Sequence, residues 1–407
     1  MTICPMLAYL DPGSGSALIG TLFAVAGAFL YSAKSLILRI FFGKKSVSVK
    51  PNERIAIFSE GRNYWGTFKP IVEELLRRNV PFSYYTLDLH DPALCIDSPL
   101  MFARLYDRDK VTSFAKLKRI KSEVLLSTTP NIGCKGYPLD RPTQVKRLVH
   151  VFHDPVGGGN YYRKGGLDNY DEILTVGPKN EITIREIEQK RSLKRKVIVP
   201  VGTPYLDSYY ERVQAEKTLA CDSIKQKKTI LVASTWGMKG VLRTFGYGFV
   251  KSLLDSGCHV IVRPHPHSYV FESDFIAKCK TEVCSWGAEW DDSVDGIKSM
   301  ARSDLMISDN SGMRCDFAYL FLRPVISMKV EKRDVSDFEA EYLKFNLADR
   351  IGEYLGETLT DVADISAAVE RLLAKGATGL EAFRNENCVN FGHAAKAVVD
   401  YLCKEAV

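Results

Sequence analysis

The chain alternates short apolar runs of strand length with segments whose apolar residues recur at helical spacing. The clearest example is Ala301–Met328. Within it, the pattern predicts a strand at 304–308, a helix at 313–322 and a second strand at 325–328, with a tight polar turn after the first strand. Such a succession of strand, helix and strand is the βαβ unit of a parallel sheet.

The same pattern recurs along most of the chain and indicates an α/β fold, because strands that alternate with helices pair in parallel. We predict two consecutive Rossmann-like parallel-sheet domains, residues 47–204 and 205–407, that face a cleft as in GT-B-type transferases, with the final helices packing back. Further strands are predicted at 54–59, 81–87, 123–127, 147–152, 172–176, 196–201, 229–233 and 258–262. Further helices are predicted at 67–78, 179–191, 247–254, 274–280, 294–302, 365–375 and 392–405.

The first fifty residues differ from the rest. No charge occurs from Pro12 to Ala33, and the segment 17–42 is mostly apolar, which gives it the ~20 residues that a membrane-spanning helix needs. Lys and Arg follow this segment but do not precede it, a pattern that places the N-terminus outside the cell and the body in the cytoplasm. We expect residues 1–46 to form a single-pass anchor in the cell membrane. A cleaved signal peptide, which needs a positive n-region, and a buried soluble helix are the alternatives.

Composition adds little to this picture. The 407 residues carry a net charge of +6, which suits an anionic substrate or a membrane surface but is too weak to indicate a nucleic-acid partner. The ten cysteines are scattered and form no C-x-x-C motif. We therefore expect reduced thiols in a cytoplasmic enzyme body rather than a disulfide framework.

Three predicted strands are followed by residues whose side chains can act in catalysis or ligand binding. The first strand is followed by His153, shortly before the glycine-rich segment 157–159. Histidine has an ordinary pKa of ~6.5, which suits proton transfer near neutral pH, so His153 is a candidate general base. Asp154 could orient its imidazole. A structural histidine at a strand end is the other interpretation.

The second strand end reads RPHPH and contains Arg263, His265 and His267. If strand alternation continues, the three side chains lie on one side and form an anion site. A metal site of His265, His267 and His153 is the rival interpretation. Because no carboxylate or thiol stands obviously nearby and a spacing of two is weak evidence, we expect neither a metal nor another cofactor.

The third strand end carries Ser234, Thr235 and Trp236 after the strand at 229–233. Hydroxyl groups and a backbone bend at this place suit a phosphate. Trp236 could pack on a nucleotide base or on the protein core.

The turn after 304–308 offers a similar environment at the start of a helix. Free N–H groups at a helix N-terminus favour a phosphate, and Ser311 and Gly312 add a small hydroxyl and a bare backbone. Asp316, one turn further, could accept a hydrogen bond from a ribose or polyol hydroxyl. Alternatively, Asp309 and Ser311 only cap the helix.

In this order, a strand-end histidine, a TW-Gly turn, an RPH-Pro segment and an SD-x-SG-x₃-D turn resemble the CDP-glycerol glycerophosphotransferases of teichoic-acid-type polymer synthesis. The segment VGTPYLD is similar to the interdomain signature of that family, which usually has Arg where Tyr205 stands. The sequence GHAA at 392–395 is similar to the start of its C-terminal helix. The resemblance covers residues 145–400.

Two departures from the family pattern concern the site itself. Phe152 and Asp154 flank His153, where the family has a Trp-His-Gly motif. Ser311-Gly312 replaces its paired serines. The identity of the acceptor and of the donor is therefore left open by the resemblance.

The resemblance implies a membrane-associated transferase of cell-envelope polysaccharide synthesis. It would move a polyol phosphate from a CDP-activated donor to a hydroxyl of a membrane-linked acceptor, with an N-terminal acceptor domain and a C-terminal nucleotide-donor domain. A GT-B glycosyltransferase that uses a nucleotide sugar and a non-catalytic scaffold of a surface-polymer assembly complex are the alternatives. The predicted catalytic residues are His153 and His265, and the predicted donor-binding residues are Ser234, Thr235, Trp236, Arg263, Asp309, Ser311, Gly312 and Asp316.

Overall fold

The structure is a computed structural model that describes residues 50–106, 114, 116–157, 162–220, 227–293, 295–330, 347–376 and 378–404. The predicted anchor, residues 1–46 with its helix at about 17–42, lies outside these residues. In the described part of the chain, no helix combines the length and the apolar character needed to cross a membrane.

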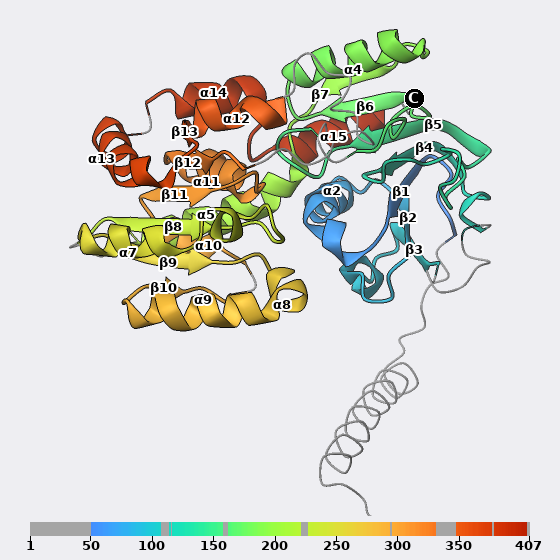
Figure 1. The fold of residues 1–407 in the computed structure, drawn as a ribbon. Coiled ribbons are helices and arrows are strands. Elements are labelled where there is room, and N and C mark those ends of the chain that lie inside the picture. Colours follow the sequence, from blue (N-terminus) through green and yellow to red (C-terminus); the bar gives the residue numbers. More distant parts are fainter. Residues whose placement is uncertain are drawn as a thin grey trace, which may run out of the picture. The chain divides into compact units, whose positions relative to one another are not determined.

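Two separate parallel sheets form the core of the fold, which confirms the predicted α/β class (Figure 1). The first sheet has the order β3-β2-β1-β4-β5-β6-β7 and the second β10-β9-β8-β11-β12-β13. The strands of the first sheet are β1 (Ile55–Ser59), β2 (Phe82–Thr86), β3 (Met101–Leu105), β4 (Lys121–Ser127), β5 (Gln144–Val151), β6 (Glu172–Thr175) and β7 (Val197–Pro200). Those of the second are β8 (Thr229–Ala233), β9 (His259–Arg263), β10 (Glu289–Trp290), β11 (Leu305–Ser308), β12 (Val325–Met328) and β13 (Gly356–Leu359).

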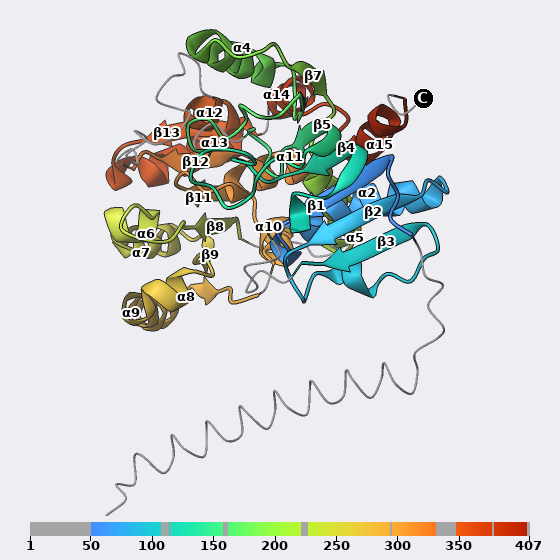
Figure 2. The ribbon, with the colours of Figure 1, turned by 90° about the vertical axis from the view of Figure 1, so that its right-hand side faces the viewer.

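Both sheets have the strand order of a Rossmann fold. From β1 the chain builds outward to β2 and β3, then crosses to the other side of β1 to form β4; Figure 2 shows β3, β2, β1, β4 and β5 side by side. The second sheet repeats this order, with β8 as its first strand and β11 as the strand after the crossing. Ligands of such sheets bind beyond the carboxyl ends of the strands at these switch points. The two switch points, β1/β4 and β8/β11, therefore define where a site is expected.

The central strands are buried on both faces. Every residue of β1 and of β8 is buried, as expected for parallel strands covered by helices on both sides, whose sequences are continuous apolar runs. Such runs predicted the central strands closely, and the strands at 229–233 and 325–328 are confirmed residue by residue. The three strands that the pattern missed, β3, β10 and β13, are all edge strands.

Helix α5 (Pro204–Ala220) links the two sheets. Its Ser208 Oγ donates to the carbonyl oxygen of Gly66 beside the first sheet at 2.6 Å, and its Arg212 pairs with Asp295 beside the second at 2.6 Å. The last helix, α15 (Ala394–Lys404), lies against α2, where Arg78 and Asp400 form an ion pair of 2.6 Å. The other helices of four residues or more are α2 (Trp65–Arg77), η2 (Pro92–Cys95), α4 (Lys179–Arg191), α6 (Val241–Thr244), α7 (Gly248–Asp255), α8 (Ser268–Phe271), α9 (Ser273–Ser285), α10 (Ile297–Arg302), α11 (Met313–Phe321), α12 (Leu347–Leu355), α13 (Ile365–Lys375) and α14 (Leu380–Asn387).

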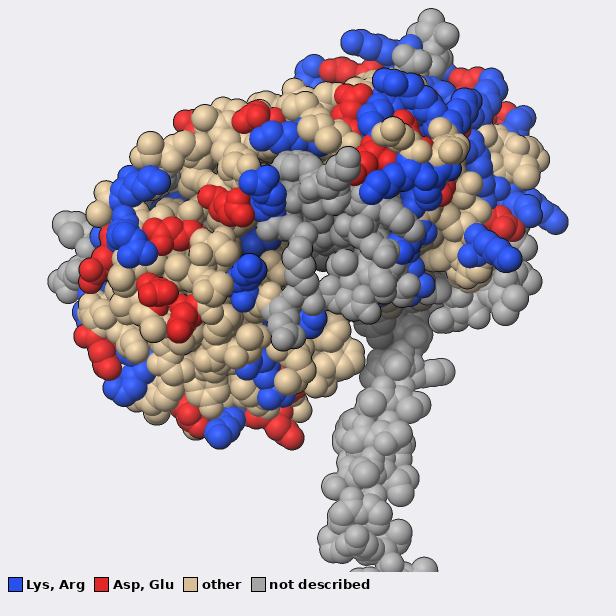
Figure 3. All heavy atoms as spheres, turned by 45° about the horizontal axis from the view of Figure 1, so that its top comes forward, with Lys and Arg blue, Asp and Glu red and all other residues tan. Residues whose placement is uncertain are grey.

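Basic side chains gather on the surface around α4 (Figure 3). Lys190, Lys194 and Arg195, at the end of this helix and in the loop after it, are exposed there. These exposed basic side chains offer a surface that an anionic partner can approach.

Candidate active site

The two polar turns of the second sheet meet at its switch point. Asp309, after β11, lies wholly buried, and its Oδ2 accepts hydrogen bonds from the backbone N–H groups of Thr235 (2.9 Å) and Val241 (2.8 Å). Its Oδ1 accepts from the N–H of Ser311 at 3.0 Å. One carboxylate therefore ties the turn after β8 to the turn after β11.

This geometry corrects the predicted role of Asp309 as a group that contacts the donor. All its hydrogen bonds go to the protein backbone, so it shapes the site without facing it. Burial raises the pKa of Asp309 to about 6, although the three backbone N–H groups oppose that shift. Asp309 does not cap α11 either, because the N–H of Ser311 precedes the helix, whose N-cap residue is Gly312.

We expect Asp309→Ala to lower the free energy of unfolding by about 2–4 kcal/mol, because each buried donor left without an acceptor costs 1–3 kcal/mol and relaxation of the turns recovers part of this. Urea unfolding of the purified variant measures the change. Asp97→Ala, at an exposed position, is the control and should stay near the wild-type value. An Asp309→Ala variant as stable as this control would contradict the structural role.

The residues after β8 divide into internal and outward-facing groups. The hydroxyl of Ser234 is buried and donates to the carbonyl oxygen of Thr235 at 2.8 Å, so it stabilises its own turn, contrary to its predicted contact with the donor. Trp236 is 42% exposed and stacks on Phe271 at 5.3 Å between ring centroids. The core interpretation of Trp236 is therefore wrong, and its ring is accessible to a planar ligand.

The N-terminus of α11 is open. A Cβ atom at Gly312 would meet no other atom within 4 Å. Among the described residues, the hydroxyl oxygen of Ser311 accepts only a long hydrogen bond, 3.4 Å, from the N–H of Met313. The backbone at Gly312 is therefore open to the approach of a ligand.

Asp316 lies one turn into α11, near Tyr205 of α5 and Asp154 of the loop after β5. Its Oδ2 accepts a hydrogen bond of 2.9 Å from the hydroxyl of Tyr205, the residue at which the family pattern has Arg. Its Oδ1 is buried and has no partner among the described residues. Burial raises the pKa of Asp316 to about 7; the bond from Tyr205 opposes this shift and the nearby Asp154 adds to it. One carboxyl oxygen is thus still able to bind a ligand hydroxyl.

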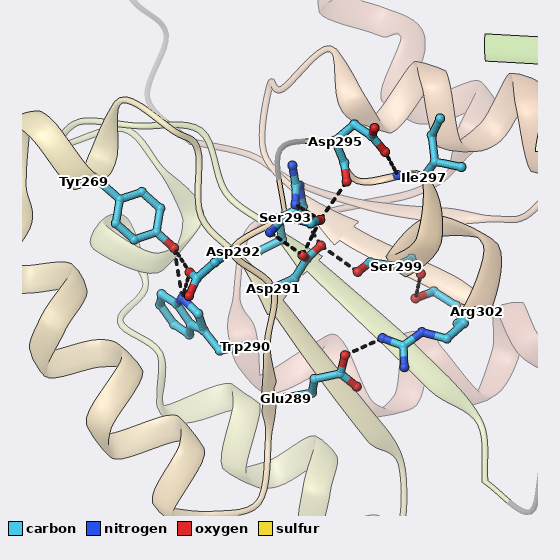
Figure 4. A network of polar contacts seen from close by, with 12 residues as sticks. Tyr269, Glu289, Trp290, Asp291, Asp292, Ser293, Asp295, Ile297, Ser299 and Arg302 are labelled. Carbon is cyan, nitrogen blue, oxygen red and sulfur yellow. Dashed lines mark hydrogen bonds and ion pairs between the residues drawn. The ribbon is translucent and has the colours of Figure 1, made fainter. Parts of the chain in front are cut away.

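Arg263 differs from its prediction. Its side chain is 5% exposed, and its guanidinium binds the Asp291 carboxylate at 2.8 Å and the Ser293 hydroxyl at 3.1 Å. Ser299 donates to the same carboxylate at 2.6 Å, within the polar network of Figure 4. The main role of a buried charge that is paired with a buried counter-charge is structural. Arg263 therefore fixes the end of β9, and the predicted alternation that placed it in one row with the two histidines is wrong, although the rings of His265 and His267 do pack together, with 5.1 Å between centroids.

The reason is that β9 ends at Arg263, so the alternation of a strand does not extend to the histidines. His265 is half-buried, whereas His267 is exposed. The N–H of His267 donates to Nδ1 of His265 at 3.1 Å. Since Nδ1 uses its lone pair in this bond, the proton of the neutral ring lies on Nε2. Burial, His267 and Arg263 all lower the pKa of His265, which makes it a neutral Nε2–H donor near pH 7.

His153 follows β5 on the first sheet. The residue is half-buried, and its Nδ1 is buried with no partner among the described residues. The edge of the ring of Tyr64 packs against it, with 5.1 Å between centroids. Burial lowers its pKa from the ordinary 6.5, while the carboxylates of Asp154 and Glu60 oppose the shift. A neutral imidazole near pH 7 is the state that a general base requires.

The sequence pattern gave no role to Glu60 and Tyr64, which lie between the strand predicted at 54–59 and the helix predicted at 67–78. Only the strand order reveals that this turn lies at the β1/β4 switch point, next to the strand that carries His153. The metal interpretation of His153, His265 and His267 finds no support in geometry: within the described ranges, no three His, Cys, Asp or Glu side chains gather as metal ligands would.

Two Rossmann-like parallel sheets joined by α5 define a GT-B-like fold. No protein family and no curated protein matches the chain by sequence. Among solved structures it is similar to the wall teichoic acid polymerase TagF soaked with CDPG, at 13% identity and a TM-score of 0.55, over 93% of this chain and 97% of that chain.

Two structures with bound uridine nucleotides are similar to a comparable degree. UDP-GlcNAc 2-epimerase from Neisseria meningitidis, bound to UDP-GlcNAc, has 12% identity and a TM-score of 0.52 over 87% of this chain and all 100% of its own. MnaA from S. aureus, in complex with UDP, has 12% identity and a TM-score of 0.55 over 88% of this chain and 98% of its own. At these identities the likeness establishes the fold.

Proposed function

We propose that this protein is a transferase that moves a polyol phosphate from a CDP-activated donor to a hydroxyl of a membrane-linked acceptor, in the synthesis of a teichoic-acid-type envelope polymer. The observation that carries the proposal is the open N-terminus of α11 at the switch point of the second sheet, where Gly312 faces open space. A diphosphate is the ligand chemistry that a helix N-terminus at this place favours.

Phosphoryl transfer depends on positioning and on stabilising charge. In the proposed step, the acceptor O–H bond breaks and its proton passes to His153. The freed oxygen forms a bond to the phosphorus that carries the polyol. The P–O bond between the two phosphates breaks, and CMP leaves with the electron pair of that bond. His265 donates its Nε2–H to the phosphate under attack, while Asp316 accepts a hydrogen bond from a donor hydroxyl.

Residues of the second sheet would hold the nucleotide. Ser311, Gly312 and Thr235 are placed around the diphosphate, and the exposed ring of Trp236 offers a stacking surface to the base. The TagF structure, prepared with CDPG, has the same fold, which supports a cytidine donor. The residue pattern shared with the CDP-glycerol glycerophosphotransferases supports it further.

A GT-B glycosyltransferase with a nucleotide-sugar donor is the second candidate. Its support is the equal fold likeness to proteins whose structures contain UDP or UDP-GlcNAc. A non-catalytic scaffold is the third. The presence of two half-buried imidazoles, His153 and His265, argues against it, because titratable groups with shifted pKa values cluster at functional sites.

The test is a nucleotide-release assay with the full-length protein, membranes and each activated donor. The proposal expects CMP from CDP-glycerol or CDP-ribitol. Release of UDP or UMP from a UDP-sugar supports the glycosyltransferase, and the absence of release from every donor supports the scaffold.

For localisation, we propose a single-pass protein of the cell membrane with its N-terminus outside and its catalytic domains in the cytoplasm. The apolar segment 17–42 and its one-sided basic flank support this topology, as does the exposed basic surface around α4, since anionic lipids attract such a surface. Protease accessibility of tags at the two ends of the chain tests it.

We expect Ser311→Ala to weaken the binding of CDP by about 0.5–3 kcal/mol, the range for a hydrogen bond to a charged group. A bulky residue at Gly312 should weaken it further by blocking the approach of the phosphate. Isothermal titration with CDP measures both, with exposed Lys329→Ala as the control. Unchanged affinity in both variants would leave the turn as a helix cap only.

A further inference from the structure

The turn that follows β1 lies at the switch point of the first sheet and is held rigidly. The N–H of Tyr64 donates to the carbonyl oxygen of Gly61 at 3.0 Å. The guanidinium of Arg62 binds both carboxylate oxygens of Asp88, at 2.7 and 2.9 Å. Gly61 has a φ of +138°, and a Cβ there would lie 2.5 Å from Cβ of Asp88. Only glycine fits, so the backbone on either side has a fixed position.

This turn and the loop of His153 leave the first sheet at the same edge. Phe58 of β1 pairs with Ser127 of β4, and Ser127 pairs with His150 of β5, so Glu60 and Phe152 each lie two residues beyond paired positions. The rings of Tyr64 and His153 pack edge to face, with 5.1 Å between centroids and an interplanar angle of 88°. Glu60 is half-buried, and its Oε1 accepts a hydrogen bond of 2.8 Å from the hydroxyl of Tyr137. Its charge acts on His153 through space and raises the pKa of that imidazole against the effect of burial.

Asp154 is a second carboxylate near His153, and it raises the pKa of that imidazole more than Glu60 does. Asp154, on the same loop, accepts a hydrogen bond of 2.6 Å from the N–H of Gly157 and so shapes its own turn. Tyr162 stacks at 6.4 Å, and burial keeps its pKa well above 10. His150, on β5, is buried, which lowers its pKa well below 6.5 and leaves it neutral.

We propose that Glu60 is a positioning residue for His153: held by Tyr137 in the rigid turn after β1, its carboxylate stabilises the positive charge that His153 gains when it takes the acceptor proton. This inference rests on the proposed function, because that function identifies the proton as the one on the acceptor hydroxyl. The electrostatic coupling of the two side chains does not depend on it. A carboxylate lowers the barrier to proton transfer when it is already in place before the imidazolium forms. The turn after β1 holds the carboxylate of Glu60 in place in this way.

The decisive measurement is the pKa of His153 itself, by NMR of the full-length protein with labelled histidine. The chain has seven histidines, and His153→Asn assigns the signal. In Glu60→Gln the pKa of His153 should fall by about 0.5–1 pH unit, less than the 1–3 units expected for a carboxylate in direct contact. Turnover should fall by at most about 3- to 10-fold, the factor that corresponds to this shift, since a weaker base accepts the proton less readily. The acidic limb of the pH–rate profile should move to lower pH by the same amount.

Two conservative variants distinguish this role from a structural one. Glu60→Asp keeps the charge, so the pKa of His153 should stay close to its wild-type value. Tyr137→Phe keeps the charge but removes the hydrogen bond that holds the carboxylate, so the pKa of His153 should fall by less than in Glu60→Gln. Exposed Glu73→Gln is the matched control. An unchanged pKa of His153 in a folded Glu60→Gln protein would overturn the inference. A lowered pKa in a protein that turns over no CDP donor would overturn the proposed function alone.

Discussion

Replacing His153 by alanine is expected to lower turnover by ~10²–10⁴-fold, the usual contribution of general acid–base catalysis. The imidazole is the side chain at the end of β5 whose Nδ1 has no partner among the described residues, and its lowered pKa keeps it neutral near pH 7. The affinity for CDP should barely change, because the residues proposed to bind the donor come from the second sheet.

The lowered pKa of His153 also predicts the direction in which turnover changes with pH. A base whose pKa lies below 6.5 is fully active above that value, and activity falls as the pH drops through it and the ring becomes protonated. The wild-type profile of turnover should therefore show an acidic limb below pH 6.5, and the His153→Ala variant should lose that limb together with most of its rate. Exposed His90→Ala is the control. Near-normal turnover in a folded His153→Ala protein would assign this histidine to the structural interpretation.

Replacing His265 by alanine is expected to have two effects, a loss of turnover of similar size and weaker donor binding. Its neutral ring presents an Nε2–H because Nδ1 accepts the N–H of His267. Loss of one preorganised donor to the phosphate under attack typically costs ~10²–10³-fold in turnover. His265→Asn should recover part of the donor affinity, since its amide can also donate a hydrogen bond. His259→Ala, on the surface beside Glu289, is the control.

Donor binding by the wild type should also change with pH, in a direction opposite to the rate. Burial and the neighbouring charges lower the pKa of His265, so the ring is neutral at pH 7 and gains a positive charge as the pH falls. A bound diphosphate favours the charged ring, so the affinity for CDP should rise below pH 6.5 while turnover falls. His265→Ala should abolish this rise. Calorimetry that finds the same pH dependence in the variant would separate His265 from the donor site, and restoration of its activity by zinc would favour a metal site.

The sequence pattern was sufficient for the central strands because a parallel strand covered on both faces must be a continuous apolar run. TILVA and VISM show this directly, and the helix at 179–191 is likewise confirmed residue by residue. The edge strands β3, β10 and β13 escaped prediction, since each is only partly buried and β10 has two residues. Their sequences carry no comparable run.

For the site, the sequence by itself determined which chemical groups stand at strand ends: two histidines, the Ser311-Gly312 turn and the carboxyl group of Asp316. Tertiary structure decided which of these groups are available. Asp309 and Arg263 are of residue types that often bind ligands, but both are buried. Asp309 accepts hydrogen bonds from backbone N–H groups, and Arg263 pairs with Asp291. In the sequence, Glu60 is an ordinary polar residue after a strand. Its turn lies beside the loop of His153 only because the chain crosses from β3 to β4. A pattern along one chain records burial and spacing, whereas the partner of a buried charge is set by the neighbouring strand in space.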